Sequence, residues 1–134
     1  MVEANTKTPT TPAELAAAIL DAIEKAPDAF DMTSWVSIAS ASGATLSPTA
    51  EPRCGTTMCV AGWAAHLLGW TLVEGMATPV RLNNGSELLV CVYAVKDGNA
   101  RLVEEVAHDA LGPGVSFYAS SDEALAQLRE IAGR

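Results

Sequence analysis

The chain has few basic residues, few aromatic residues and no long apolar run. It holds 8 Lys and Arg against 16 Asp and Glu in 134 residues, a formal net charge of −8. Nucleic-acid binding needs Lys and Arg to displace counterions, so this charge argues against a nucleic-acid partner. No apolar stretch approaches the roughly 20 residues that span a bilayer, and the polar start does not resemble a secretory signal. We therefore expect a cytoplasmic protein that has no membrane partner.

Cysteine is scarce as well. The three Cys residues are an odd number and fit a disulfide framework poorly, so we expect free thiols. Small apolar residues, above all Ala, are abundant, and hydrophobic residues make up 49% of the chain. This composition predicts one core of small side chains, pinned by three Trp residues. The expected organisation is a disordered segment over residues 1–10 and a single globular domain over residues 11–134.

Capping patterns and helical spacing predict four helices. Residues 11–14, Thr-Pro-Ala-Glu, form a capping box with Pro at the first helical position, and residues 120–123 form a second capping box. A slim apolar helix ending at Gly69 is expected to lie at the centre of the domain. The predicted helices run over residues 12–25, from 56 or 57 to 68, over 102–111 and over 121–132.

One segment carries a clear β signal. Residues 83–85, Asn-Asn-Gly, lie between alternating apolar residues and predict a tight hairpin turn. A helix beginning at Ser86 is the competing interpretation, because residues 88–92 are apolar throughout. Residues 39–53 are rich in Ser, Ala, Thr, Gly and Pro, and predict a long mobile surface loop. The predicted fold class is α+β: a compact, mainly helical domain of about four helices with one small β-hairpin.

The most unusual segment for chemistry holds two Cys residues at a predicted helix start. A helix N-terminus lowers the pKa of a thiol, so Cys54 or Cys59 could be reactive, with His66 or His108 as a base. Cys54, Cys59 and His66 are also candidate zinc ligands, completed by Cys91 or His108, although zinc sites usually show closer Cys pairs. The favoured interpretation is structural: Cys59 packs as a small apolar residue. No other cofactor is expected.

Three carboxylates share one face of the predicted third helix. Glu104, Glu105 and Asp109 could bind a cation or catalyse a reaction. A solvated charged face is the favoured interpretation, since such faces are common on surface helices. Phosphate-binding glycine patterns and nucleophile-elbow patterns are missing from the sequence, so no catalytic residue is assigned and enzymatic activity is left open.

Two segments resemble motifs of a known group of small proteins. Residues 54–64, Cys-Gly-Thr-Thr-Met-Cys-Val-Ala-Gly-Trp-Ala, resemble the motif of a group found in actinobacteria and in the phages that infect them. Residues 30–35, Phe-Asp-Met-Thr-Ser-Trp, resemble an aromatic–Asp–Met–x–x–Trp element of the same group. The resemblance implies a bacterial or phage origin. It implies no activity, because the group has none established.

These observations favour a non-enzymatic accessory protein that acts by binding another protein. In a phage setting, such a protein would be a host-directed or defence-related factor. Its contact surface is expected to include residues 39–53. It should also include whichever of Trp35, Trp63 and Trp70 the fold leaves uncovered. One alternative is a zinc-dependent or thiol-dependent protein that uses the Cys and His residues named above. Another is a structural or virion component, in which the chain forms a homo-oligomer.

Overall fold

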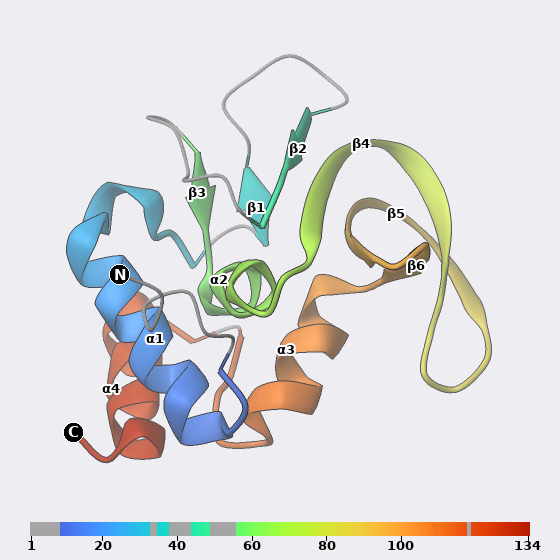
Figure 1. Ribbon diagram of the computed structural model, residues 1–134. Helices are drawn as coiled ribbons and strands as arrows, with labels where there is room; N and C mark the ends of the chain where they lie inside the picture. The colour runs from blue at the N-terminus through green and yellow to red at the C-terminus, as the bar shows by residue number, and fades with distance from the viewer. Residues whose placement is uncertain (1–8, 33–34, 38–43, 49–55, 118) are drawn as a thin grey trace.

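The computed structural model describes residues 9–32, 35–37, 44–48, 56–117 and 119–134. Within these residues the chain forms four α-helices, one short 3₁₀ helix and six strands, arranged in a two-stranded and a four-stranded sheet (Figure 1). The prediction of a mainly helical domain with one small hairpin is therefore wrong, because the α+β fold contains far more strand. No helix among the described residues has the length and apolarity to cross a membrane.

The first helix, α1 (Pro12–Lys25), confirms the predicted bounds. The Thr11 hydroxyl accepts a hydrogen bond from the Glu14 backbone N–H at 3.1 Å. The Glu14 carboxylate accepts from the backbone N–H of Thr10 at 2.9 Å, one residue before the donor that the capping box predicts. Thr10 is thus tied to the helix, whereas residues 1–8 of the predicted disordered segment lie outside the described residues. A single turn, η2 (Pro27–Ala29), follows α1.

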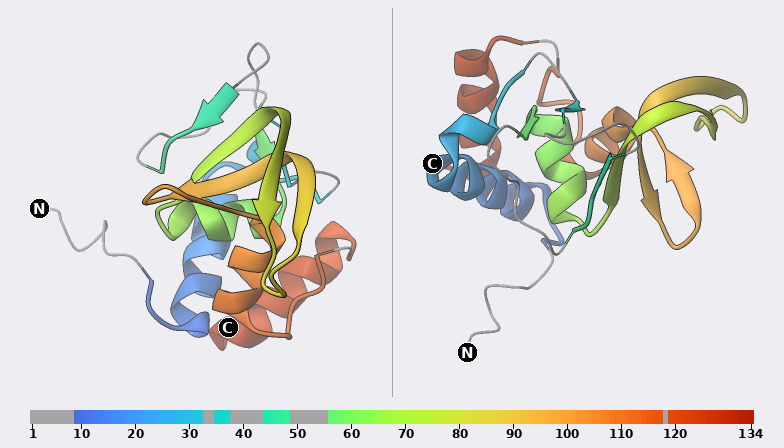
Figure 2. Two further views of the ribbon diagram at one scale, coloured as in Figure 1. Left: turned by 90° about the vertical axis from the view of Figure 1, so that its right-hand side faces the viewer. Right: turned by 90° about the horizontal axis from the view of Figure 1, so that it is seen from above.

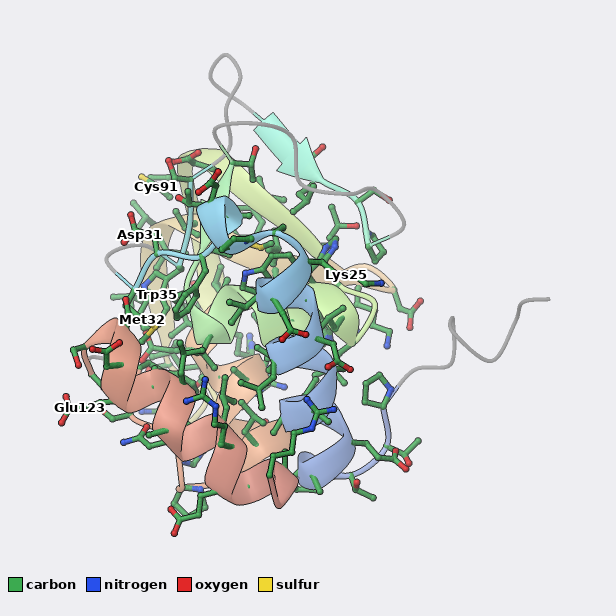
Figure 3. All side chains as sticks on the ribbon, turned by 90° about the vertical axis from the view of Figure 1, so that its left-hand side faces the viewer. Lys25, Asp31, Met32, Trp35, Cys91 and Glu123 are labelled. Atoms are coloured by element: carbon green, nitrogen blue, oxygen red, sulfur yellow. The ribbon has the colours of Figure 1, made fainter. Side chains whose placement is uncertain are left out.

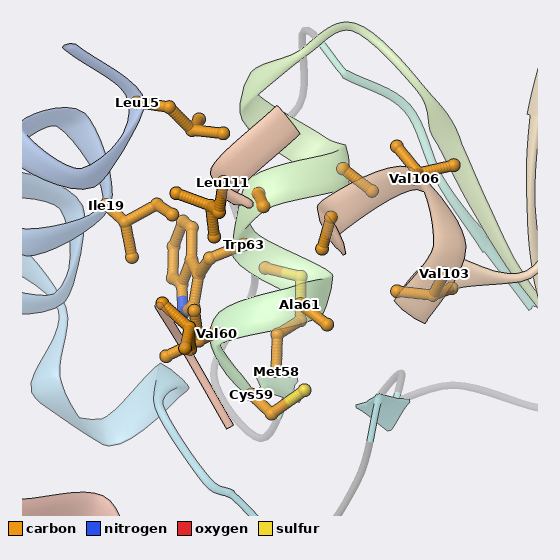
Figure 4. Close-up of a cluster of buried hydrophobic side chains, with 14 of the residues drawn as sticks. Leu15, Ile19, Met58, Cys59, Val60, Ala61, Trp63, Val103, Val106 and Leu111 are labelled. Atoms are coloured by element: carbon orange, nitrogen blue, oxygen red, sulfur yellow. The ribbon is translucent and has the colours of Figure 1, made fainter. Parts of the chain in front are cut away.

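The central helix is α2 (Val60–Leu67), which contacts α1, α3 (Val103–Leu111) and the sheet. Every residue from Val60 to His66 is buried, so the helix is covered on all sides (Figure 4). It begins later than predicted, because residues 57 and 58 form β3 (Thr57–Met58) instead of the first helical turn. Gly69 ends the helix as predicted, with a φ of +95°.

The two-stranded sheet explains why the start of α2 is shifted. Strand β1 (Val36–Ser37) pairs antiparallel with β3, and this pairing lays the backbone of Trp35 across α2. A Cβ atom on Gly62 would overlap the carbonyl oxygen of Trp35 and would stand 2.9 Å from the Cβ of Met58. Gly62 is therefore required for close approach of the two segments, and not for an unusual backbone angle.

The remaining helices confirm their predicted positions. Helix α3 ends at Gly112, and α4 (Ser121–Ala132) begins with the predicted capping box between Ser120 and Glu123. Helix α4 packs against α1, and the two cover the side of α2 that is remote from the four-stranded sheet (Figures 1 and 2).

The four-stranded sheet is antiparallel in the order β2-β4-β5-β6. The predicted hairpin is confirmed as β4 (Thr71–Arg81) and β5 (Glu87–Lys96), and Gly85 takes a φ of +91° at its tip. Strand β2 (Ala44–Leu46) lies inside the predicted loop 39–53, so that part of the loop prediction is wrong. The rest of that loop falls mostly outside the described residues. A further strand, β6 (Asn99–Arg101), pairs with β5.

The distal part of the hairpin, residues 75–92, forms an arm that arches outward (Figures 1 and 2) and returns at its tip, where Asn83 meets Glu105 of α3. The register of β4 against β5 shifts between Glu74 and Thr78, so three residues of β4 oppose Cys91 alone. Extra residues on one strand bend a hairpin and increase its twist. The bend sets the arm apart from the rest of the sheet and gives it a concave side.

Gly62→Ala should lower the free energy of unfolding by about 1–3 kcal/mol, because the added methyl group must displace the Trp35 backbone. In an unobstructed helix the same change would raise stability by roughly 0.5–1 kcal/mol, so the sign of the effect separates the two cases. Urea unfolding measures it. An unchanged or higher stability would contradict the close contact.

Candidate protein-binding groove

A groove of about 370 Å³ runs between β5, Trp35 and the start of α3. Its walls are apolar except for one carboxylate and one thiol. The lining residues are Trp35, Leu88, Val90, Cys91, Val92, Leu102, Val103 and Glu104. Its volume is within the range of pockets that hold small ligands or a few side chains.

The groove lies along the face of β5 that looks toward Trp35 and α3, next to an open edge of the strand. Alternate residues of a strand share a face, and Leu88, Val90 and Val92 line the groove together with Cys91. Strand β6 pairs only with residues 94–96 of β5. Residues 87–93 have no strand partner on that edge within the described part of the chain.

Two adjacent leucines on the arm are exposed. Leu88 is 48% exposed and Leu89 is 67% exposed, and they are the large hydrophobic residues that the described surface leaves uncovered. They point to opposite faces of the hairpin, and only Leu88 lines the groove. The pair supplies a matched comparison, because the two side chains have the same chemistry in different places.

Trp35 forms a fixed wall of the groove. Its ring meets that of Phe117 edge to face, with the ring centroids 6.3 Å apart and the planes at 77°. Trp35 is partly buried and packs against the core, on the side of the molecule that also carries Met32 (Figure 3). Together with the contact of its backbone against Gly62, these neighbours hold the indole in place.

A polar cluster ties the tip of the arm to α3. The Asn83 backbone N–H donates to Glu105 Oε2 at 3.1 Å, and Arg101 Nη2 donates to Asn83 Oδ1 at 2.6 Å. Arg101 also contacts Asp109 Oδ2 at 2.9 Å. The three carboxylates of the predicted solvated face of α3 therefore have different surroundings. Glu105 and Asp109 hold Arg101, whereas Glu104 lines the groove. The cluster fixes the distance between the arm and α3.

Arg101→Met should speed amide hydrogen exchange of Asn83 and of the arm by about threefold to tenfold, because partly exposed charged hydrogen bonds are lost. Arg81→Met is the matched control, since Arg81 is an exposed residue of the arm outside this cluster. Equal exchange in the two variants would show that the cluster does not hold the arm.

The predicted zinc ligands are not assembled in the part of the chain that the structure describes. Cys54 lies outside the described residues. Cys59 and His66 are both buried in or next to α2, whereas Cys91 and His108 are exposed elsewhere. No group of three His, Cys, Asp or Glu residues that could hold a metal ion occurs among the described residues.

Cys59 occupies the N-cap position of α2. The thiol-dependent alternative predicts a reactive thiol of low pKa at this position. Burial raises the pKa of the Cys59 thiol above its ordinary value, and this effect outweighs the backbone N–H groups of Gly62 and Ala61, which act in the opposite direction. At 1% exposure the sulfur also lacks access to a reagent. The structure therefore supports the interpretation of Cys59 as a small apolar core residue.

In a Cys54→Ser background, Cys91 should react with a thiol reagent at the rate of a free cysteine, because it is exposed on the arm. Cys59 should react at least about 100-fold more slowly, since its thiol is buried and protonated at neutral pH. Timed alkylation read by mass spectrometry separates the two sites. Fast labelling of Cys59 would restore the thiol hypothesis.

The three tryptophans have different places. Trp63 is 3% exposed within the core, so it offers no surface to a partner (Figure 4). Trp70 is partly buried, and the Nζ atom of Lys96 lies 6.0 Å from its ring centroid. Trp35 alone among them lines the groove.

Sequence reasoning missed the aliphatic lining of the groove. Residues 88–92 are apolar without alternation, a pattern that fits either a helix or a strand. Because the turn at residues 83–85 identifies this run as a strand, its uninterrupted apolar residues make both faces of the strand apolar. That signal could have identified Leu88 and Leu89 as a candidate contact surface.

Comparison of the chain with protein families, with curated proteins and with solved structures finds no match.

Proposed function

We propose that this chain is a non-enzymatic accessory protein that binds another protein through the groove beside β5. The observation that carries the proposal is Leu88, which lines the groove and remains 48% exposed. Contiguous apolar surface that a chain leaves open is typical of a protein-binding site. The motif resemblance supports a bacterial or phage origin and a place in the cytoplasm of a bacterial cell, in a host-directed or defence-related role.

The shape of the groove supports binding more than catalysis. Its apolar walls suit an aliphatic or aromatic anchor, and the fixed Trp35 ring reduces the entropy that binding would cost. Of its lining residues, Glu104 and Cys91 alone carry groups that take part in acid–base or nucleophilic chemistry. The thiol-dependent alternative gains no support from Cys59, whose pKa is raised by burial.

Leu88→Ser should reduce capture of the partner from a bacterial lysate by roughly tenfold, because a Leu side chain contributes about 1.5–3 kcal/mol when it is fully buried. Leu89→Ser removes an equally apolar and more exposed side chain that does not line the groove, so it should leave capture unchanged. Quantitative mass spectrometry of the captured proteins gives the ratio.

Thermal unfolding of both variants serves as the control for folding. If Leu89→Ser abolishes capture while Leu88→Ser does not, the partner binds the opposite face of the arm. If both variants capture the same proteins as the unchanged chain, the arm is not the contact surface and the proposed function fails.

A further inference from the structure

The free edge of β5 points to the way in which a partner is bound. Resting on the proposed function, we infer that an extended segment of a basic protein adds to β5 as a further strand along residues 87–93. Strand addition supplies main-chain hydrogen bonds from an open sheet edge and specificity from pockets for alternate side chains. The open edge of β5 and the groove on the adjoining face of the same strand supply these two requirements side by side.

The first requirement is an edge with free backbone groups. At the tip, the Leu82 N–H donates to the Ser86 carbonyl at 2.8 Å, which places the peptide groups of Ser86 toward β4. Peptide groups alternate in direction along a strand, so those of Leu88 point toward β4 and those of Leu89 point away from it. The Leu89 N–H and carbonyl thus face the open edge.

The two edges of the arm differ in their protection. The β4 edge of the arm contains Pro79, which has no N–H to donate, and the irregular residues 75–77. Proline and bulges are the usual means by which an edge strand avoids pairing with another chain. Residues 87–93 of β5 contain neither Pro nor Lys and follow a continuous register up to Val90. One edge is blocked, and the other is left available.

The second requirement is a pocket for alternate side chains of the added strand. Side chains that point toward the helices would meet Trp35, Leu102 and Val103 on the far wall of the groove. Those walls are apolar, so alternate positions of the bound segment should be apolar as well. The Asn83 cluster holds the arm at the distance from α3 that leaves this space open.

Charge decides between a basic partner and a second copy of this chain. Glu104 lines the groove, whereas Glu87, at the distal end of the open edge, stands opposite Arg81 in the hairpin, so Glu104 is the carboxylate that a bound segment would meet. The chain has a net charge of −8, so pairing two copies through β5 would bring together like charges. A segment with Lys or Arg beside its apolar residues complements Glu104. The bound segment is therefore basic and belongs to another protein.

A random seven-residue peptide library, panned on the full chain, tests the inference even though the partner is unidentified. The enriched peptides should alternate apolar residues with polar ones and carry Lys or Arg. Each should slow hydrogen exchange at the amides that face the open edge, above all that of Leu89. Failure to enrich any peptide, or enrichment of acidic peptides, would overturn the inference.

Variants at Leu89 separate backbone pairing from side-chain contact. Leu89→Pro removes the outward N–H, and its expected effect is to weaken the enriched peptide by about tenfold, the value of one backbone hydrogen bond. Leu89→Ala keeps that N–H, so it should change affinity by less than about twofold. Glu104→Gln should weaken the peptide by about threefold to tenfold and reduce its salt dependence, since one charge contact is lost. Equal affinity for Leu89→Pro and the unchanged chain would exclude strand addition.

The outcomes also separate this inference from the proposed function. If Leu88→Ser loses the lysate partner but Leu89→Pro retains it, the groove binds a protein without strand addition, and the inference alone fails. If the free chain already protects the outward amide of Leu89 and sediments as a dimer, the edge is occupied by a second copy, which overturns the inference of a basic partner. Should Leu88→Ser retain every partner, both proposals fail together.

Discussion

The contact between the Trp35 backbone and Gly62 is the constraint on which the rest of the structure depends. It allows the strand pair β1-β3 to lie directly on α2, where any side chain at position 62 would meet a carbonyl oxygen. The same contact places the Trp35 ring beside Phe117 and along the groove. A core position thereby determines the geometry of a surface site, because the wall of the groove cannot move unless the β1 backbone leaves α2.

The small residues of α2 extend this argument to the whole domain. Ala61, Ala64 and Ala65 have no measurable exposure, so neighbouring elements approach the helix closely on every side. Such a helix gains little from side-chain volume and depends on close packing, where added methyl groups are costly. The Ala residues of α2 are thus required by the enclosure of this helix on every side. The larger side chains are supplied by α1, α3 and α4, which pack around it.

Local signals predicted much of the fold, and long-range pairings account for what was missed. Capping boxes identified α1 and α4, and Gly85 identified the hairpin, because a cap or a turn depends on a few consecutive residues. Strands of two or three residues such as β1 and β3 have no periodicity of their own, so only their tertiary partners define them. Pairing with β1 also drew residues 57 and 58 out of the predicted helix, which shows tertiary contact overriding a capping preference.

The candidate site was harder to predict for the same reason. Its walls come from residue 35, from residues 88–92 and from residues 102–104, which the fold alone brings together. Among the residues predicted to bind a partner, Trp35 lines the groove, whereas Trp63 is enclosed in the core. The motif that holds Cys59 and Gly62 suggests chemistry when only the sequence is considered. In the structure it is better explained by packing, since the Cys59 thiol is buried and Gly62 makes room for the Trp35 backbone.

The arm exposes apolar surface to water, which is energetically unfavourable and which a purely structural hairpin would avoid. A solvated strand usually presents polar residues on its outer face, yet Leu88 and Leu89 expose apolar surface on both faces of β5. The Asn83 cluster and the bend at residues 75–77 hold this surface in a fixed position instead of letting it collapse onto the domain. A hairpin that is apolar on both faces and fixed in position supports the proposal of a protein-binding surface. Pro79 strengthens this argument, because it closes the edge of β4 and leaves the edge of β5 as the open side.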